Sequence, residues 1–156
     1  MNDKKVMTYQ ELLQGFRDNG YRLKSYGKIR ENRQIYTLYK IVINPRYKRT
    51  LLITSGFHGE EYNGPISLLE CFDEAVAYAN KMRVRLIVYP CVNPSGFDLR
   101  QRYNASGEKQ NNDFIRYILE GGKLVGVLKS GEPYSAINII QSPAREVRAL
   151  QKDGLG

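Results

Sequence analysis

The segment GFHGEE, residues 56–61, contains the only histidine of this 156-residue chain, three residues before a glutamate. Imidazole nitrogen and carboxylate oxygen both bind zinc, at about 2.0–2.2 Å. His58 and Glu61 can point at one ion if the segment turns back on itself, and Gly56 and Gly59 permit a tight bend. The spacing therefore permits two ligands of a zinc site. Taken alone, the pattern fits a polar loop at least as well.

A second polar stretch lies about fifty residues further on. It reads NPSGFDLRQRYNASGEKQNNDF, residues 93–114, and follows the apolar segment VRLIVYPCV, residues 84–92. As far as residue 112 it is rich in Asn, Gly and Ser and has no sustained hydrophobic period. A loop of this length inside a compact domain is usually functional or disordered.

The elements that must position these stretches form a strand, loop, helix, strand pattern over residues 49–92, which is typical of a βαβ unit with parallel strands. Ligands of such sheets gather at the carboxyl ends of the strands, where both polar stretches begin. The expected fold is one α/β domain over residues 1–156, with a mixed, largely parallel twisted sheet and helices on both faces. Further elements are expected at these positions: helices over 8–18, 113–120 and 142–152, and strands over 21–28 and 34–44.

The net charge of +8 is concentrated in residues 1–50, which hold 12 Lys and Arg against 4 Asp and Glu. Tyrosines interleave with these basic residues, a pattern that can bind single-stranded nucleic acid by stacking and phosphate contact. A solvated sheet edge explains the same composition and is the favoured interpretation. The tyrosines concerned are Tyr21, Tyr26, Tyr36, Tyr39 and Tyr47.

The composition excludes a membrane-spanning helix, because no run of about 18 apolar residues occurs. The beginning MNDKKVMTYQ lacks the apolar segment of a signal peptide. Cys71 and Cys91 have no CxxC spacing, which favours reduced core residues over a disulfide. A soluble cytoplasmic protein is expected.

Together, GFHGEEYNG and the 93–114 stretch resemble the zinc carboxypeptidase family, including its relatives that deacylate amino acids and cleave murein peptides. The family pattern is HxxE after a buried strand, Asn-Pro-x-Gly after the next strand, Arg-x-Asn, and then Asn-Arg before a phenylalanine. The matching segments are Asn93–Gly96, Arg102–Asn104, Asn111–Asn112 and Phe114. With the final SPAREVRAL, the resemblance spans roughly residues 49–150.

The resemblance implies a role for five residues. His58 and Glu61 would be zinc ligands, and Arg102 would polarise the scissile carbonyl and stabilise the oxyanion. Asn111 would help to hold the terminal group of the substrate. Asn112 stands where the family has a carboxylate-binding arginine, and an amide cannot form a charged bidentate clamp. The motif therefore does not predict selectivity for a free C-terminal carboxylate. Arg116 or Arg100 could substitute for the missing arginine, although neither matches the motif.

The resemblance also implies parts that this chain lacks. The family supplies a second histidine ligand and a general-base glutamate later in its sequence, whereas His58 is the only histidine here. We therefore expect the amino-terminal part of a zinc-dependent hydrolase, ending before the carboxy-terminal strands of the fold and inactive alone. Its substrate would be a peptide, a murein peptide or an acyl amino acid. The alternative is a non-catalytic module that binds peptide or nucleic acid.

Overall fold

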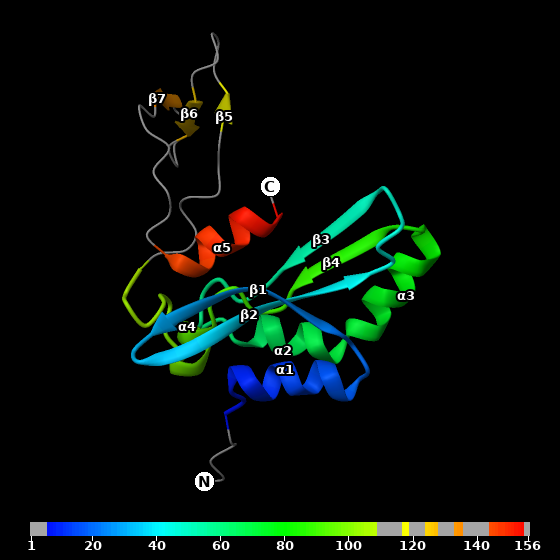
Figure 1. Ribbon diagram of the computed structural model, residues 1–156, viewed down its shortest axis with the longest axis horizontal. Helices are drawn as coiled ribbons and strands as arrows, with labels where there is room; N and C mark the ends of the chain where they lie inside the picture. Colours follow the sequence, from blue (N-terminus) through cyan, green and yellow to red (C-terminus); the bar gives the residue numbers. More distant parts are fainter. Residues whose placement is uncertain (1–5, 109–116, 119–123, 128–132, 136–143, 155–156) are drawn as a thin grey trace.

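The computed structural model describes residues 6–108, 117–118, 124–127, 133–135 and 144–154 (Figure 1). Helices and strands follow one another in this order: α1 (Tyr9–Asp18), β1 (Leu23–Glu31), β2 (Gln34–Ile43), β3 (Thr50–Thr54), α2 (Asn63–Glu70), α3 (Phe72–Met82), β4 (Arg85–Tyr89), α4 (Pro94–Leu99), β5 (Tyr117–Ile118), β6 (Leu124–Val127), β7 (Pro133–Ser135) and α5 (Arg145–Gly154).

The main sheet has four strands in the order β1-β2-β4-β3, with the pairs β1/β2 and β2/β4 antiparallel and β3/β4 parallel. The mixed sheet is confirmed, and so is the parallel pair that the βαβ pattern predicts. The antiparallel share is larger than expected in the described part. One of the two antiparallel pairs is the β1–β2 hairpin, whose two turn residues, Asn32 and Arg33, both have positive φ, as the tight turns that join antiparallel strands require. A separate three-stranded sheet has the order β5-β6-β7.

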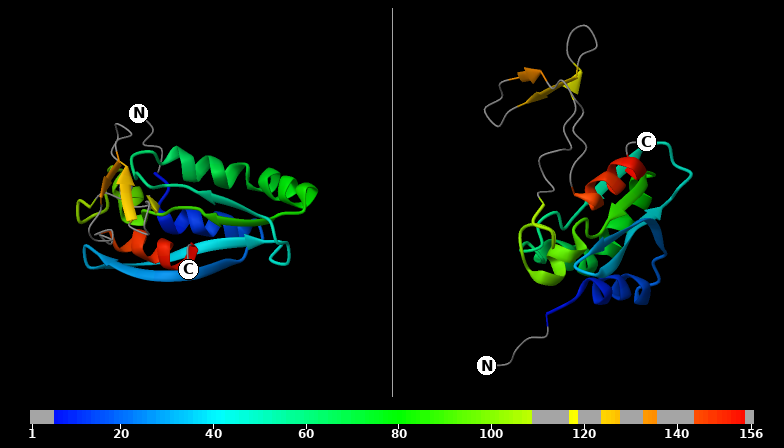
Figure 2. Two further views of the ribbon diagram at one scale, coloured as in Figure 1. Left: turned by 90° about the horizontal axis from the view of Figure 1, so that it is seen from above. Right: turned by 60° about the vertical axis from the view of Figure 1, so that its left-hand side comes forward.

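Helices cover both faces of the main sheet (Figures 1 and 2). Along β4, Leu86 and Val88 belong to the larger apolar core, which includes the buried side of α1, whereas Tyr89 packs on the opposite face with Leu150 of α5. Successive side chains of a strand point to opposite faces, so α1 and α5 lie on opposite sides of β4. The expectation of helices on both faces is confirmed.

Local signals explain where the first helix begins and how the last one is attached. Thr8 and Glu11 form a capping box at the start of α1, which begins one residue after the start of the helix expected over 8–18. Asp153, near the end of α5, accepts two hydrogen bonds from Lys40 of β2, at 2.6 and 2.7 Å, and one from the hydroxyl of Tyr89, at 2.6 Å. These contacts fasten α5 to two strands of the sheet.

Two further expectations concern cysteines and membranes. Cys71 and Cys91 are both free; Cys91 is buried as expected, whereas Cys71 is exposed, so the expectation of a core residue was wrong for Cys71. Among the described residues, no helix combines the length and the apolar character needed to cross a membrane.

Candidate metal centre

The candidate centre lies where β3 and β4 end, at the carboxyl edge of the parallel pair. Beyond this point the two chains stay together through backbone hydrogen bonds. Ser55 N donates to Tyr89 O at 3.0 Å, Val92 N donates to Ser55 O at 2.9 Å, and Asn93 N donates to Gly56 O at 2.9 Å. The two polar stretches singled out in the sequence therefore meet side by side.

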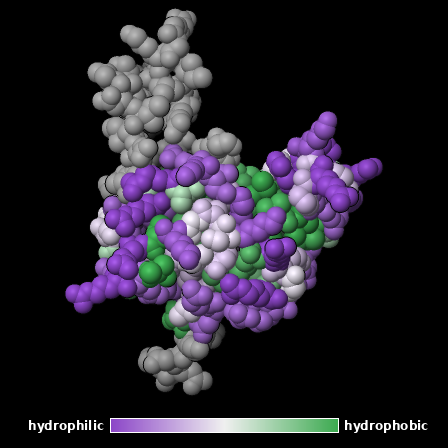
Figure 3. Space-filling view, viewed as in Figure 1, coloured by the Kyte–Doolittle hydropathy of each residue, from purple (hydrophilic) through white to green (hydrophobic). Residues whose placement is uncertain are grey.

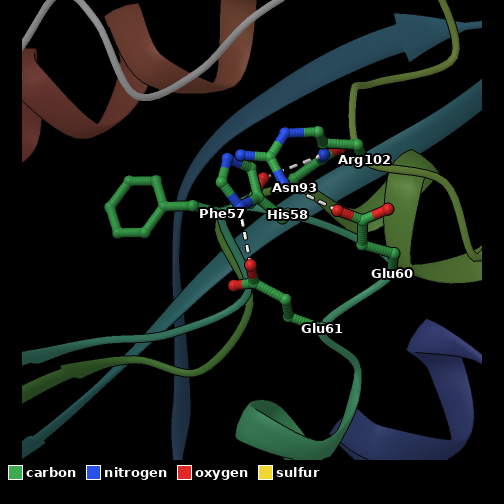
Figure 4. A network of polar contacts seen from close by, with 6 residues as sticks. All are labelled: Phe57, His58, Glu60, Glu61, Asn93 and Arg102. Atoms are coloured by element: carbon green, nitrogen blue, oxygen red, sulfur yellow. Dashed lines mark hydrogen bonds and ion pairs between the residues drawn. The ribbon is translucent and has the colours of Figure 1, made fainter.

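The structure brings His58 and Glu61 into direct contact. Nδ1 of His58 and Oε1 of Glu61 are 3.0 Å apart, and the backbone N–H of Glu61 donates to the carbonyl of His58 at 3.2 Å, closing a turn (Figure 4). The imidazole side chain is 10% exposed and the carboxylate side chain 66% exposed. Two ligands of a tetrahedral zinc with bonds of about 2.1 Å lie about 3.4 Å apart. The observed spacing is thus close to that of a shared ion, with the carboxylate on the solvent side.

Asn93 holds the histidine loop in place, a role that the sequence analysis did not assign. Its side chain is buried, donates to the carbonyl of Phe57 at 3.1 Å and accepts from the N–H of Gly96 at 2.9 Å. Asn93 is also the N-cap of α4, and Pro94 follows it in the first helical turn. An Asn-Pro pair is a recognised start signal for a helix, so the sequence contained a signal for α4 within the stretch expected to be a loop.

The two loops touch backbone to backbone at Gly59. A Cβ atom at this position would lie 1.9 Å from both the carbonyl carbon and the carbonyl oxygen of Gly96. Only a residue without a side chain fits there. This contact fixes the position of His58, immediately before Gly59, against the 93–96 turn.

Arg102 approaches the same edge and forms an ion pair with Glu60. Its NH1 donates to Oε1 of Glu60 at 2.8 Å, and both side chains are about half exposed (Figure 4). The hydrogen bond to Glu60 is the main cause that raises the pKa of Arg102, and the negative charge of Glu61 raises it further. The guanidinium is therefore a permanent cation within the electrostatic reach of the His58–Glu61 pair. Glu60 was not predicted as a site residue, and only its position between the two ligand candidates could have drawn attention to it.

Several residues expected at the site lie outside the described residues. Asn111 and Asn112 are among them, as is Arg116. Within the described ranges, no group of three His, Cys, Asp or Glu side chains is arranged to hold a metal ion. His58 and Glu61 thus fit as two ligands of a site that needs at least one more.

Three of the five tyrosines in the basic first third pack against other rings or lie in the core. Tyr36 is buried in the core. The ring of Tyr26 packs against Tyr89 at 5.1 Å between centroids, and the ring of Tyr21 packs against Phe72 at 4.6 Å. These tyrosines serve core packing, and the geometry gives no indication of nucleic-acid binding.

Comparison with known proteins gives a family match across this region. The family profile of the succinylglutamate desuccinylase/aspartoacylase catalytic domain matches residues 47–123, which include both polar stretches. No curated protein matches the chain.

Solved structures match over a wider range. A candidate metallopeptidase from Shewanella amazonensis SB2B is 29% identical with a TM-score of 0.62, and one from Shewanella baltica OS155 is 31% identical with the same TM-score. Each match covers 94% of this chain and 48% of the other. Bovine thrombin-activatable fibrinolysis inhibitor, at 20% identity and a TM-score of 0.60, matches in fold over 96% of this chain and 55% of its own. The chain thus spans about half the length of the Shewanella proteins it matches, and the matches agree with the resemblance seen in the two polar stretches.

Proposed function

Because the chain is zinc carboxypeptidase-like in both sequence and fold, we propose that it provides the amino-terminal half of a zinc-dependent amide hydrolase. The substrate is a peptide, a murein peptide or an acyl amino acid, and the reaction adds water across an amide bond to give a carboxylic acid and an amine. This chain contributes His58 and Glu61 as metal ligands and Arg102 as the cation beside the metal. The remaining ligand and the general base come from polypeptide outside this chain.

One observation carries the proposal. Nδ1 of the only histidine and a carboxylate oxygen three residues later lie 3.0 Å apart at the carboxyl edge of a parallel strand pair, where sheets of this class bind their ligands. Asn93 and the contact at Gly59 hold the loop from behind. These contacts support the two side chains from neighbouring backbone, as a preorganised site requires.

The donor set suits zinc, which accepts nitrogen and carboxylate oxygen together. When bound, zinc supplies a Lewis acid that polarises a carbonyl oxygen and lowers the pKa of a bound water. His58 would bind through Nδ1, the atom that faces Glu61. Two ligands alone bind zinc weakly, and so we expect the isolated chain to be inactive.

Arg102 is suited to bind the carbonyl oxygen of the substrate. A guanidinium remains charged at every physiological pH and offers several N–H donors, and donors aimed at an oxygen that gains negative charge are a large source of rate acceleration. In the structure one N–H group of Arg102 is engaged with Glu60. Glu60 then acts as a positioning residue that holds the guanidinium at the edge of the site.

Substrate-end recognition is assigned to Asn111 and Asn112 from the motif alone. Asn111 would bind the terminal group of the substrate. The amide of Asn112 can form hydrogen bonds but no ion pair, so a free terminal carboxylate gains no charged partner there and a neutral terminal group should be accepted about equally well.

Zinc titration of the purified chain tests the proposal. Competition with a chromophoric chelator should show weak binding by the wild-type chain and at least about tenfold weaker binding by His58→Ala and by Glu61→Gln. Glu60→Gln is the matched control, since it removes the same charge one residue away without removing a ligand, and its affinity should equal that of the wild type. Equal zinc affinity in the wild type and His58→Ala would refute the assignment.

A further inference from the structure

The tip of the β1–β2 hairpin holds a buried carboxylate. Arg30, Asn32 and Arg33 are exposed there, and the surface around the tip is mainly hydrophilic (Figure 3). Glu31, however, is only 3% exposed and shares its face of β1 with the core residue Ile29. In the part of the chain that the structure describes, no Lys, Arg or His forms an ion pair with Glu31. A buried carboxylate without a cation requires hydrogen-bond donors around it.

The donors to Glu31 found among the described residues all come from one segment, residues 95–106. Its Oε2 accepts from the hydroxyl of Ser95 at 3.4 Å, and from the N–H and the hydroxyl of Ser106 at 3.2 and 3.3 Å. Its Oε1 accepts from the side-chain amide of Asn104 at 3.4 Å. The hydroxyl of Ser95 in turn accepts from the N–H of Ala105 at 3.0 Å. Hydrogen bonds to an ionised group are stronger than those between neutral groups, so Glu31 ties this segment to the hairpin, which lies beside it (Figures 1 and 2).

The segment tied to Glu31 is the one that carries Arg102. Two residues after Arg102, the fully buried Asn104 contacts Glu31. One residue before Arg102, the N–H of Gln101 donates to the carbonyl of Gly96 in α4 at 3.1 Å. The side chain of Gln101 also donates to the carbonyl of Asn104 at 3.1 Å and closes the turn. The backbone of Arg102 is therefore held on both sides, by α4 and by the hairpin.

Two other carboxylates contact Asn104, but neither replaces Glu31 as the anchor. Nδ2 of Asn104 donates to Glu108 at 2.9 Å, and Glu108 belongs to the same stretch of chain, so this bond cannot fasten the stretch to the sheet. Glu146 of α5 lies 3.5 Å from Nδ2, at the outer limit of a hydrogen bond. Glu31 is thus the principal polar link between the Arg102 segment and the main sheet.

Building on the role proposed above for Arg102, we propose that Glu31 is a positioning residue of the hydrolase. Its carboxylate holds the backbone on which Arg102 stands at the edge of the candidate site, while Glu60 holds the guanidinium itself. Glu31 precedes residues 47–123, which match the family profile. The amino-terminal hairpin therefore helps to build the site, although the matching region begins after it.

Glu31→Gln in the complete 156-residue chain tests the proposal, because it removes the charge and keeps the shape. Whichever way the new amide turns, its NH2 group faces a donor, either Asn104 or the two serines. Amide hydrogen exchange of Ala105 and Ser106 should become about tenfold faster or more. Nitrogen relaxation of the Arg102 Nε–H group, identified by its absence in Arg102→Lys, should change from that of a held side chain to that of a freely mobile one.

Two control variants separate positioning from general stability. Glu60→Gln frees only the guanidinium, so the Arg102 Nε–H group should become mobile while exchange at Ala105 and Ser106 stays as in the wild type. Asp153→Asn removes another carboxylate acceptor, the one that binds Lys40 and Tyr89. It should lower the free energy of unfolding and leave both measurements at residues 102–106 unchanged.

The result that overturns the proposal is an Arg102 signal in Glu31→Gln that equals the wild type, or a change that Asp153→Asn reproduces in full. If Glu31→Gln does not fold, Ser95→Ala serves instead, since it removes one donor to Glu31 and the acceptor of Ala105. It should produce the same two changes to a smaller extent, and a wild-type result would overturn the proposal. Neither measurement needs zinc or substrate. A failed zinc titration therefore counts against the metal ligands alone, and an unchanged Arg102 signal counts against the role of Glu31 alone.

Discussion

Replacing Gly59 with alanine should separate the two loops that build the candidate site. The added Cβ would lie 1.9 Å from the carbonyl carbon and oxygen of Gly96, whereas ordinary contacts begin at 3.4 Å. The loops must therefore part by about 1.5 Å, because neither neighbour is a movable side chain. Such a shift breaks the bonds from Asn93 to the carbonyls of Gly56 and Phe57, now 2.9 and 3.1 Å long.

Each of these bonds is worth about 1 kcal/mol, and the buried groups left unpaired add to the loss. We expect Gly59→Ala to lower the free energy of unfolding by about 3 kcal/mol, or the melting temperature by roughly 6–12 °C for a chain of this size. Zinc affinity should fall as well, since His58 moves with the loop. Urea unfolding monitored by circular dichroism measures the first effect, and chelator competition the second.

Gly64→Ala is the matched control. Gly64 lies in the first turn of α2, and a Cβ there meets only the side-chain oxygen of Ser55, at 3.2 Å. Alanine is about 1 kcal/mol better than glycine in a helix, so this variant should be as stable as the wild type or slightly more stable. If Gly59→Ala unfolds within about 0.5 kcal/mol of the wild type, the two loops are not locked together as described.

Three further outcomes follow from the sequence and the structure. The isolated chain should show no peptidase activity with added zinc; turnover that copurifies with it and disappears in His58→Ala would contradict this. In a longer form that is active, peptides with free and with amidated C-termini should be comparable substrates, because Asn112 offers no charge to a carboxylate. A hundredfold preference for the free acid, about 2.7 kcal/mol, would show that another cation binds the carboxylate. Asp153→Ala should lower the free energy of unfolding by about 2–4 kcal/mol, because it leaves Lys40 and the Tyr89 hydroxyl without their shared acceptor. A loss below about 0.5 kcal/mol in urea unfolding would show that α5 is held by apolar packing alone.

Much of the fold could be predicted because local signals and tertiary contacts agree. The helix expected over 8–18 and the two strands of the βαβ unit are found close to where the sequence placed them, and the meeting of the two polar stretches follows from parallel pairing. The single helix expected between the two strands of the βαβ unit divides at Cys71 into α2 and α3. Periodicity does not show this break, because the apolar spacing continues through it. The antiparallel pairing of β2 with β4 joins segments about forty residues apart, and strand periodicity carries no information about which neighbour a strand chooses.

The sequence pointed to the two candidate ligands but not to the residues that support them. His58 and Glu61 were singled out by the HxxE spacing together with the family resemblance, and the structure places their side chains in contact. The pairing of Glu60 with Arg102 joins side chains 42 residues apart on the surface, and many other partners for Arg102 were equally compatible with the sequence. The side chain of Asn93 forms its two hydrogen bonds with backbone groups of Phe57 and Gly96. Because every residue has such backbone groups, the sequence does not show which of them Asn93 will bind.

The most direct test of the central claim uses the fact that His58 is the only histidine of the chain. A long-range proton–nitrogen NMR spectrum of uniformly labelled protein contains a single imidazole, so every change in it reports on this residue. Adding zinc should shift the Nδ1 resonance strongly, because metal binding occurs at the nitrogen that faces Glu61, and the shift should be lost in Glu61→Gln and retained in Glu60→Gln. An imidazole spectrum that zinc leaves unchanged, or one that responds equally in both variants, would contradict a metal site formed by His58 and Glu61.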